Sequence, residues 1–70
     1  MQNNISVIFG KRLSVLRVER EFTQKQMAEK LQVSVSTYAN WEQGRREPDI
    51  EHLIMLAEIL EIDMNSLFEL

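Results

Sequence analysis

The 70-residue sequence contains no cysteine, one histidine, one proline and two glycines. Without cysteine, it has no disulfide, thiolate metal site or thiol nucleophile, and a single histidine argues against a transition-metal cluster. No apolar run approaches the roughly 20 residues that span a bilayer, and the opening residues MQNNIS lack the features of a secretory signal. We therefore expect a cytoplasmic protein with no membrane partner, no cofactor, no metal and no evident small-molecule ligand.

The short length limits both the domain count and the core. A chain of this size forms one domain at most, so we take residues 1–70 as a single domain. Its small core is expected to depend on compact local packing or self-association. Because the sequence shows no nucleophile–base pair, metal-ligand spacing or phosphate-binding glycine loop, we do not expect an enzyme.

Positive charge is confined to the first two thirds of the chain. The overall net charge of −3 taken alone argues against a nucleic-acid partner. However, residues 1–46 hold all eight Lys and Arg with four Asp and Glu, whereas residues 47–70 hold seven acids and no Lys or Arg. The split predicts one basic and one acidic surface, with chance clustering in a small sample as the alternative.

Hydrophobic periodicity near 3.6 predicts helices along nearly the whole chain. A first helix over about 5–20 is indicated by an apolar stripe, formed by Ile5, Phe9, Leu13 and Leu16. A second helix of about eight residues begins at a capping box, Thr23 with Gln26. Ser34 is suited to cap a third helix, which Gly44 ends after Gln43.

The last third of the chain predicts two more helices. Asp49 caps a fourth over about 50–61, and Asp63 caps a short fifth over about 64–68. The inner stripe of the fourth helix is Ile50, Leu53, Ile54, Leu56, Ala57 and Leu60. Since no segment has the pattern of a strand, the predicted class is all-α.

The segment from Gln24 to Gln43 has the spacing of a helix-turn-helix. Apolar residues occupy its fourth, eighth, tenth, fifteenth and eighteenth places, namely Met27, Leu31, Val33, Tyr38 and Trp41. The stretch TQKQMAEKLQVSVSTYANWEQGRREP resembles the DNA-binding domain of lambda-repressor-like, Cro-type regulators, the xenobiotic-response-element family. With KRLSVLR before it and LIMLAEILEIDMNSLF after it, the resemblance covers about residues 8–68 and implies a compact five-helix DNA-binding domain.

Two positions depart from the family pattern. Gln32 stands in the turn where glycine is usual, and a positive φ there would cost roughly 1 kcal/mol. Tyr38 replaces a smaller aliphatic core residue, so its hydroxyl needs a hydrogen-bond partner.

The resemblance implies that the third helix lies in the DNA major groove, with the base contacts made by Val35, Ser36, Thr37 and Asn40. Asn40 can pair with adenine, and the methyl groups of Val35 and Thr37 can contact thymine. None of the four positions carries Arg, Lys or Gln, so the common arginine–guanine contact is absent. The alternative is a merely solvated polar face.

Phosphate contacts are expected on both sides of that helix. The resemblance places Gln24 against the DNA backbone, and Arg45 and Arg46 follow the third helix. Arg12 and Lys25 are candidates from charge alone.

The resemblance also implies a structural ion pair between Arg17 of the first helix and Glu42 of the third, which would fix the angle of the third helix. Apolar residues in the last two helices suggest a homodimer interface, with the candidates Met55, Ile59, Leu67, Phe68 and Leu70. Burial of Met55 and Ile59 beneath the C-terminus is the alternative.

These features predict a sequence-specific regulator of transcription, more specifically a repressor, that binds a pseudo-palindromic operator in double-stranded DNA as a homodimer. The competing hypothesis is a protein-interaction module, of antitoxin or anti-repressor type, that keeps the fold without strong DNA binding. The sequence leaves open a role as a phage regulator, a restriction–modification controller or an antitoxin.

Overall fold

The computed structural model describes residues 4–69, which contain five helices and, within that range, no strand. The helices are α1 (Asn4–Glu19), α2 (Gln24–Leu31), α3 (Val35–Gln43), α4 (Ile50–Leu60) and α5 (Met64–Leu67). The all-α class and the five predicted helices are confirmed, with ends that differ from the expected ones by a residue at most.

The predicted capping residues begin the last four helices. Thr23, Ser34, Asp49 and Asp63 each accept a hydrogen bond from the backbone N–H three residues further on. The capping box at α2 is complete, because the side chain of Gln26 also accepts from the Thr23 N–H at 2.8 Å. These bonds satisfy N–H groups that have no partner inside the helix and thereby fix where each helix starts.

Apolar side chains from all five helices meet in one core. Its buried members are Phe9, Leu13, Leu16, Met27, Ala28, Leu31, Tyr38, Trp41, Leu56, Leu60 and Leu67. Among the predicted apolar residues, however, Ile5, Ile50 and Ile54 are 64%, 75% and 48% exposed. Their predicted burial was wrong, because Ile5 and Ile50 lie in the first turns of α1 and α4, and Ile54 lies on the flank of α4.

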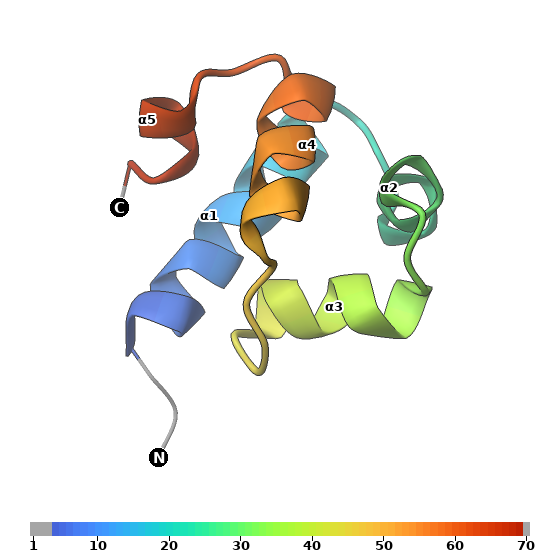
Figure 1. Ribbon diagram of the computed structural model, residues 1–70, viewed down its shortest axis with the longest axis horizontal. Coiled ribbons are helices and arrows are strands. Elements are labelled where there is room, and N and C mark those ends of the chain that lie inside the picture. Colours follow the sequence, from blue (N-terminus) through green and yellow to red (C-terminus); the bar gives the residue numbers. More distant parts are fainter. Residues whose placement is uncertain (1–3, 70) are drawn as a thin grey trace.

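The third helix lies at one edge of the molecule. In Figure 1, α3 runs across the lower edge, α2 stands beside its first turn and is seen nearly end-on, and α5 lies at the opposite end. The inner side of α3 packs against α1 and α2. The arrangement leaves the outer side of α3 open along its length.

Gly10 allows α1 to approach the end of α3 closely. A Cβ at this position would lie 2.3 Å from the carbonyl oxygen of Glu42 and 2.7 Å from that of Trp41. Any other residue would therefore push the two helices apart. A glycine that weakens α1 as an isolated helix is thus required by its packing against α3.

Among the described residues, left-handed backbone occurs at Glu21, Gln32, Gly44 and Glu61. Gly44 ends α3 with φ of 76°, and Gln32 ends α2 with φ of 60°. The glycine adopts this conformation without strain, whereas the glutamine does so at the turn position where the family usually has glycine.

Candidate nucleic-acid interface

The two sides of α3 differ in chemistry. Tyr38 and Trp41 are buried, and their rings meet edge to face at 6.0 Å. The outer side holds the four predicted base-contact residues: Val35, Ser36 and Thr37 are exposed, and Asn40 is half-buried. The structure thus brings all four onto the open side of one helix.

Sequence reasoning missed two further residues on this side. Half-buried Ala39 and exposed Gln43 also lie away from the core. Both follow from helical geometry, since residues three and four apart share a face and Gln43 is three residues after Asn40. Counting from the buried pair Tyr38 and Trp41 would have identified them.

The carboxylate of Glu42 joins α3 to α1 and α2. Arg17 donates to it through Nε at 2.6 Å and through a second guanidinium nitrogen at 3.3 Å. The Tyr38 hydroxyl donates at 2.6 Å, and the Gln24 side-chain amide donates at 2.9 Å. The ion pair implied by the resemblance is therefore present, and the tyrosine that departs from the family pattern has its partner.

Burial and hydrogen bonding set the charges in this cluster. Burial opposes the charged form of Glu42, but the bonds from Arg17, Tyr38 and Gln24 outweigh it and hold the pKa of Glu42 below its usual value. Burial, followed by the bond to Glu42, raises the pKa of Tyr38, and the bond to Glu42 raises the pKa of Arg17. The glutamate is thus charged and both partners are protonated at neutral pH.

Three cationic side chains lie around α3 and are open to solvent. Lys25 is in the first turn of α2, and Arg45 and Arg46 follow α3. Within the described residues, none of the three side chains makes a hydrogen bond or ion pair. The backbone N–H groups of both arginines donate to the Asn40 carbonyl, at 3.0 and 3.4 Å, which folds the loop against the end of α3.

Two other predicted phosphate ligands have partners inside the protein. Arg12 donates to the carbonyl oxygen of Ser66 from two nitrogens, at 3.2 and 3.0 Å, and so binds the end of α5 rather than lying free beside α3. The Arg12 guanidinium is therefore held at α5 and not at the helix-turn-helix, and the structure does not support the predicted phosphate contact by Arg12. Gln24 is half-buried, with its amide on Glu42 at the start of α2.

The predicted dimer residues differ in their exposure to solvent. Leu67 is fully buried in the core, and Met55 and Ile59 are partly buried against it, so only Phe68, at 44% exposed, presents a large apolar surface. Leu67 is therefore wrong as an interface residue, because α5 folds onto the core. Leu70 lies outside the described residues.

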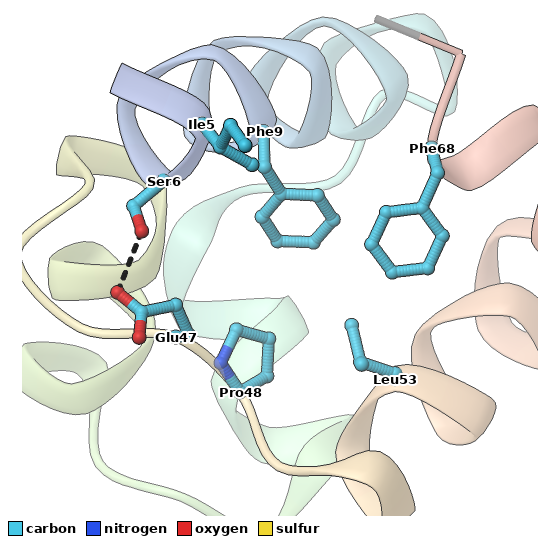
Figure 2. A pocket seen from close by; sticks show the side chains of 7 residues that line it. All are labelled: Ile5, Ser6, Phe9, Glu47, Pro48, Leu53 and Phe68. Atoms are coloured by element: carbon cyan, nitrogen blue, oxygen red, sulfur yellow. Dashed lines mark hydrogen bonds between the residues drawn. The ribbon is translucent and has the colours of Figure 1, made fainter. Parts of the chain in front are cut away.

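Phe68 instead borders a shallow apolar groove between α1, α4 and α5. The groove encloses about 220 Å³ and is lined mainly by Ile5, Phe9, Pro48, Leu53 and Phe68. Figure 2 shows the rings of Phe9 and Phe68 side by side in the lining of the groove, and the Ser6 hydroxyl donating to Glu47 at one end. The two ring centroids are 5.4 Å apart.

In residues 4–69, no group of three or more His, Asp or Glu side chains is placed to hold a metal ion. No helix in that same range is long and apolar enough to span a bilayer.

An anchored outer helix, a second helix inclined to it and flanking cations define a helix-turn-helix unit of the DNA-binding type. Residues 13–67 match the family described as helix-turn-helix. The chain therefore belongs to the Cro/C1-type helix-turn-helix family.

Three comparisons illustrate the relationship. The chain is 34% identical over 62 residues to the HTH-type transcriptional regulator YqaE of Bacillus subtilis, covering 89% of this chain and 53% of that protein. The structure resembles the restriction–modification controller C.AhdI from Aeromonas hydrophila, with 30% identity, a TM-score of 0.81 and coverage of 87% and 92%. It also resembles the biofilm regulator SinR, solved in complex with DNA, with 25% identity, a TM-score of 0.76 and coverage of 84% and 95%.

Sequence relatives are longer than this chain, which spans about half the length of the curated relatives it matches.

Proposed function

We propose that this protein is a transcriptional regulator that binds specific sequences in double-stranded DNA, with α3 in the major groove. The observation that carries the proposal is the open outer side of α3, where Val35, Ser36, Thr37 and Asn40 present small groups suited to base edges. The Glu42 cluster supports this role, since it holds that helix at a fixed angle to α1 and α2.

The proposed phosphate contacts flank α3 and set the position of the protein on the duplex. Lys25 and the start of α2 lie on one side, and Arg45 and Arg46 lie beyond the other end. Gln24 can bind Glu42 and a phosphate at the same time, because its amide nitrogen carries a second hydrogen besides the one donated to Glu42. These groups bind phosphates without reading sequence. They also give the surface around α3 positive charge, although the net charge of the protein is negative.

We further propose a homodimer formed through the groove rather than through the predicted residues of α4. Ile5 and Phe68 are exposed apolar residues that line it, and Ile50 and Ile54 are exposed on α4, the helix that supplies its Leu53. We call these four exposed residues the apolar patch. In a two-fold dimer the same patch meets itself, and the two α3 helices would sit about 34 Å apart to match a pseudo-palindromic operator.

Repression requires only that the dimer occupy its operator and exclude other proteins from it, so we favour a repressor over an activator. This role implies a cytoplasmic location. The names of the similar proteins support regulation of transcription, and SinR was solved with DNA bound. A protein-interaction module remains the competing outcome of the test.

Selection of bound duplexes from a random pool tests the proposal. We expect a motif with two inverted half-sites whose centres lie about one helical turn apart. Absence of enrichment at low salt, with a folded protein, would favour the interaction module.

The dimer is tested separately by sedimentation equilibrium. Ile54→Lys should give a folded monomer, because it places a charge in the apolar patch, whereas Glu29→Lys on α2, which does not line the groove, should still dimerise. Equal self-association of the two variants would move the interface elsewhere.

A further inference from the structure

We infer that the part of each half-site read by α3 consists of A·T base pairs. The inference rests on the proposed function and specifies which DNA the same surface recognises. It follows from the complete set of side chains on the outer side of α3, including the two that sequence reasoning missed.

The outer side of α3 carries methyl groups and amides but no positive charge. Its members are Val35, Ser36, Thr37, Ala39, Asn40 and Gln43. Guanine is most often read by Arg or Lys donating to its O6 and N7, and neither residue occurs within α3. Arg45 and Arg46 lie beyond the helix end at Gly44, in the loop folded against it.

The amides select adenine. Asn and Gln side chains can donate to adenine N7 and accept from its N6 amino group at once, a pairing that other bases do not offer in the major groove. The Asn40 side chain makes no hydrogen bond with other described residues, so its amide is available for a base.

The methyl groups select thymine on the same base pairs or their neighbours. Val35, Thr37 and Ala39 present aliphatic carbon, and thymine alone carries a methyl group in the major groove. The Ser34 hydroxyl donates to the Thr37 hydroxyl oxygen at 2.9 Å, and this bond holds the Thr37 side chain in one rotamer. Ser36 bonds either base type and adds no contrary preference.

The length of the reading surface sets the size of the A·T segment. From Ser36 to Gln43 the helix rises about 10 Å, at 1.5 Å per residue, which corresponds to about three base pairs. We therefore expect about three successive A·T pairs in each half-site.

The test uses the duplex obtained by selection and substitutes single base atoms in it. Replacing thymine by uracil in the A·T segment removes one methyl group and should weaken binding about fourfold per contacted thymine. Replacing adenine by 7-deazaadenine removes the N7 acceptor and should weaken binding where an amide reads it. Asn40→Ala should weaken binding to the selected duplex about 5- to 140-fold and relax the adenine preference at one base pair.

Asn65→Ala is the matched control, because Asn65 is an exposed asparagine on α5, at the opposite end from α3. It should bind like the parent protein, and both variants should show the parent melting temperature.

The outcomes separate the inference from the proposed function. The selected motif could be an inverted repeat that requires a G·C pair at the position where Asn40→Ala relaxes the base preference. That result would overturn the inference but would still support the proposed function. The same follows if uracil and 7-deazaadenine change nothing. If no duplex is enriched, both fail.

Discussion

Arg17→Ala should destabilise the fold rather than weaken DNA contact directly. The Arg17 side chain is 15% exposed and that of its partner Glu42 is 6% exposed. Removing the guanidinium leaves a mostly buried carboxylate with only the hydrogen bonds from Tyr38 and Gln24. It also removes the donor to the Phe22 carbonyl, at 2.8 Å, which ties the turn between α1 and α2.

The magnitude follows from breaking a buried ion pair on one side. That change costs roughly 3–5 kcal/mol in other proteins, and the two remaining bonds to Glu42 place this case at about 3 kcal/mol. A domain of this size has a total stability of about 4–10 kcal/mol. The melting temperature should therefore fall by about 12–24 °C.

Thermal unfolding followed by circular dichroism measures the effect, with Lys11→Ala as the control on α1. The Lys11 side chain is exposed and makes no hydrogen bond or ion pair with other described residues. Its removal should therefore change the free energy of unfolding by at most about 0.5 kcal/mol. If the two variants melt within a few degrees of each other, the stabilising role of the Arg17–Glu42 pair is refuted.

Three further predictions concern stability. Gln32→Gly should raise the free energy of unfolding by about 0.5–1 kcal/mol in urea titrations, because glycine relieves the positive φ at that turn; a loss of stability would contradict this. Gly10→Ala should lower the melting temperature, because its methyl group would meet the Glu42 carbonyl, and an unchanged temperature would show that α1 and α3 can separate freely. Folding lowers the pKa of Glu42 from its usual value of 4.5, so the charged glutamate contributes stability above pH 4.5 and loses it as the pH falls through the lower pKa of the folded state. The difference in free energy of unfolding between wild type and Glu42→Gln should therefore shrink as the pH is lowered through that range.

Much of the fold could be predicted because its signals are local. The capping residues Thr23, Ser34, Asp49 and Asp63 each act within three residues along the chain, so the sequence alone locates the helix starts. The spacing of the helix-turn-helix likewise fixes which side of α3 is buried.

What could not be predicted depends on contacts between distant segments. Arg12 looks like an exposed cation in the sequence, but α5 folds back and its Ser66 carbonyl accepts from the guanidinium. The same folding buries Leu67, whereas Ile54, on the inner stripe predicted for α4, is 48% exposed. Periodicity identifies the apolar face of a helix, but it does not show how far the neighbouring helices cover that face. It therefore cannot distinguish residues at the flank of the face from residues in the core.

The hydrogen bond from the Gln24 amide to Glu42 is a second contact between distant segments. The resemblance related Glu42 to Arg17 alone, whereas the structure adds a bond from Gln24 and another from Tyr38. The Gln24 bond connects the proposed phosphate contact to the helix proposed to read the bases, and no spacing in the sequence indicates it. The Tyr38 bond is local, because Tyr38 precedes Glu42 by four residues on the same helix.

The salt dependence of binding to the selected duplex tests the central claim most directly. Lys25, Arg45 and Arg46 give six proposed cationic phosphate contacts per dimer, and a slope of about −0.9 per contact predicts about −5 for log affinity against log salt concentration. Arg46→Ala removes two contacts per dimer and should reduce the slope by about 2. A slope near zero, or one that Arg46→Ala leaves unchanged, would contradict the placement of α3 and its flanking cations on DNA.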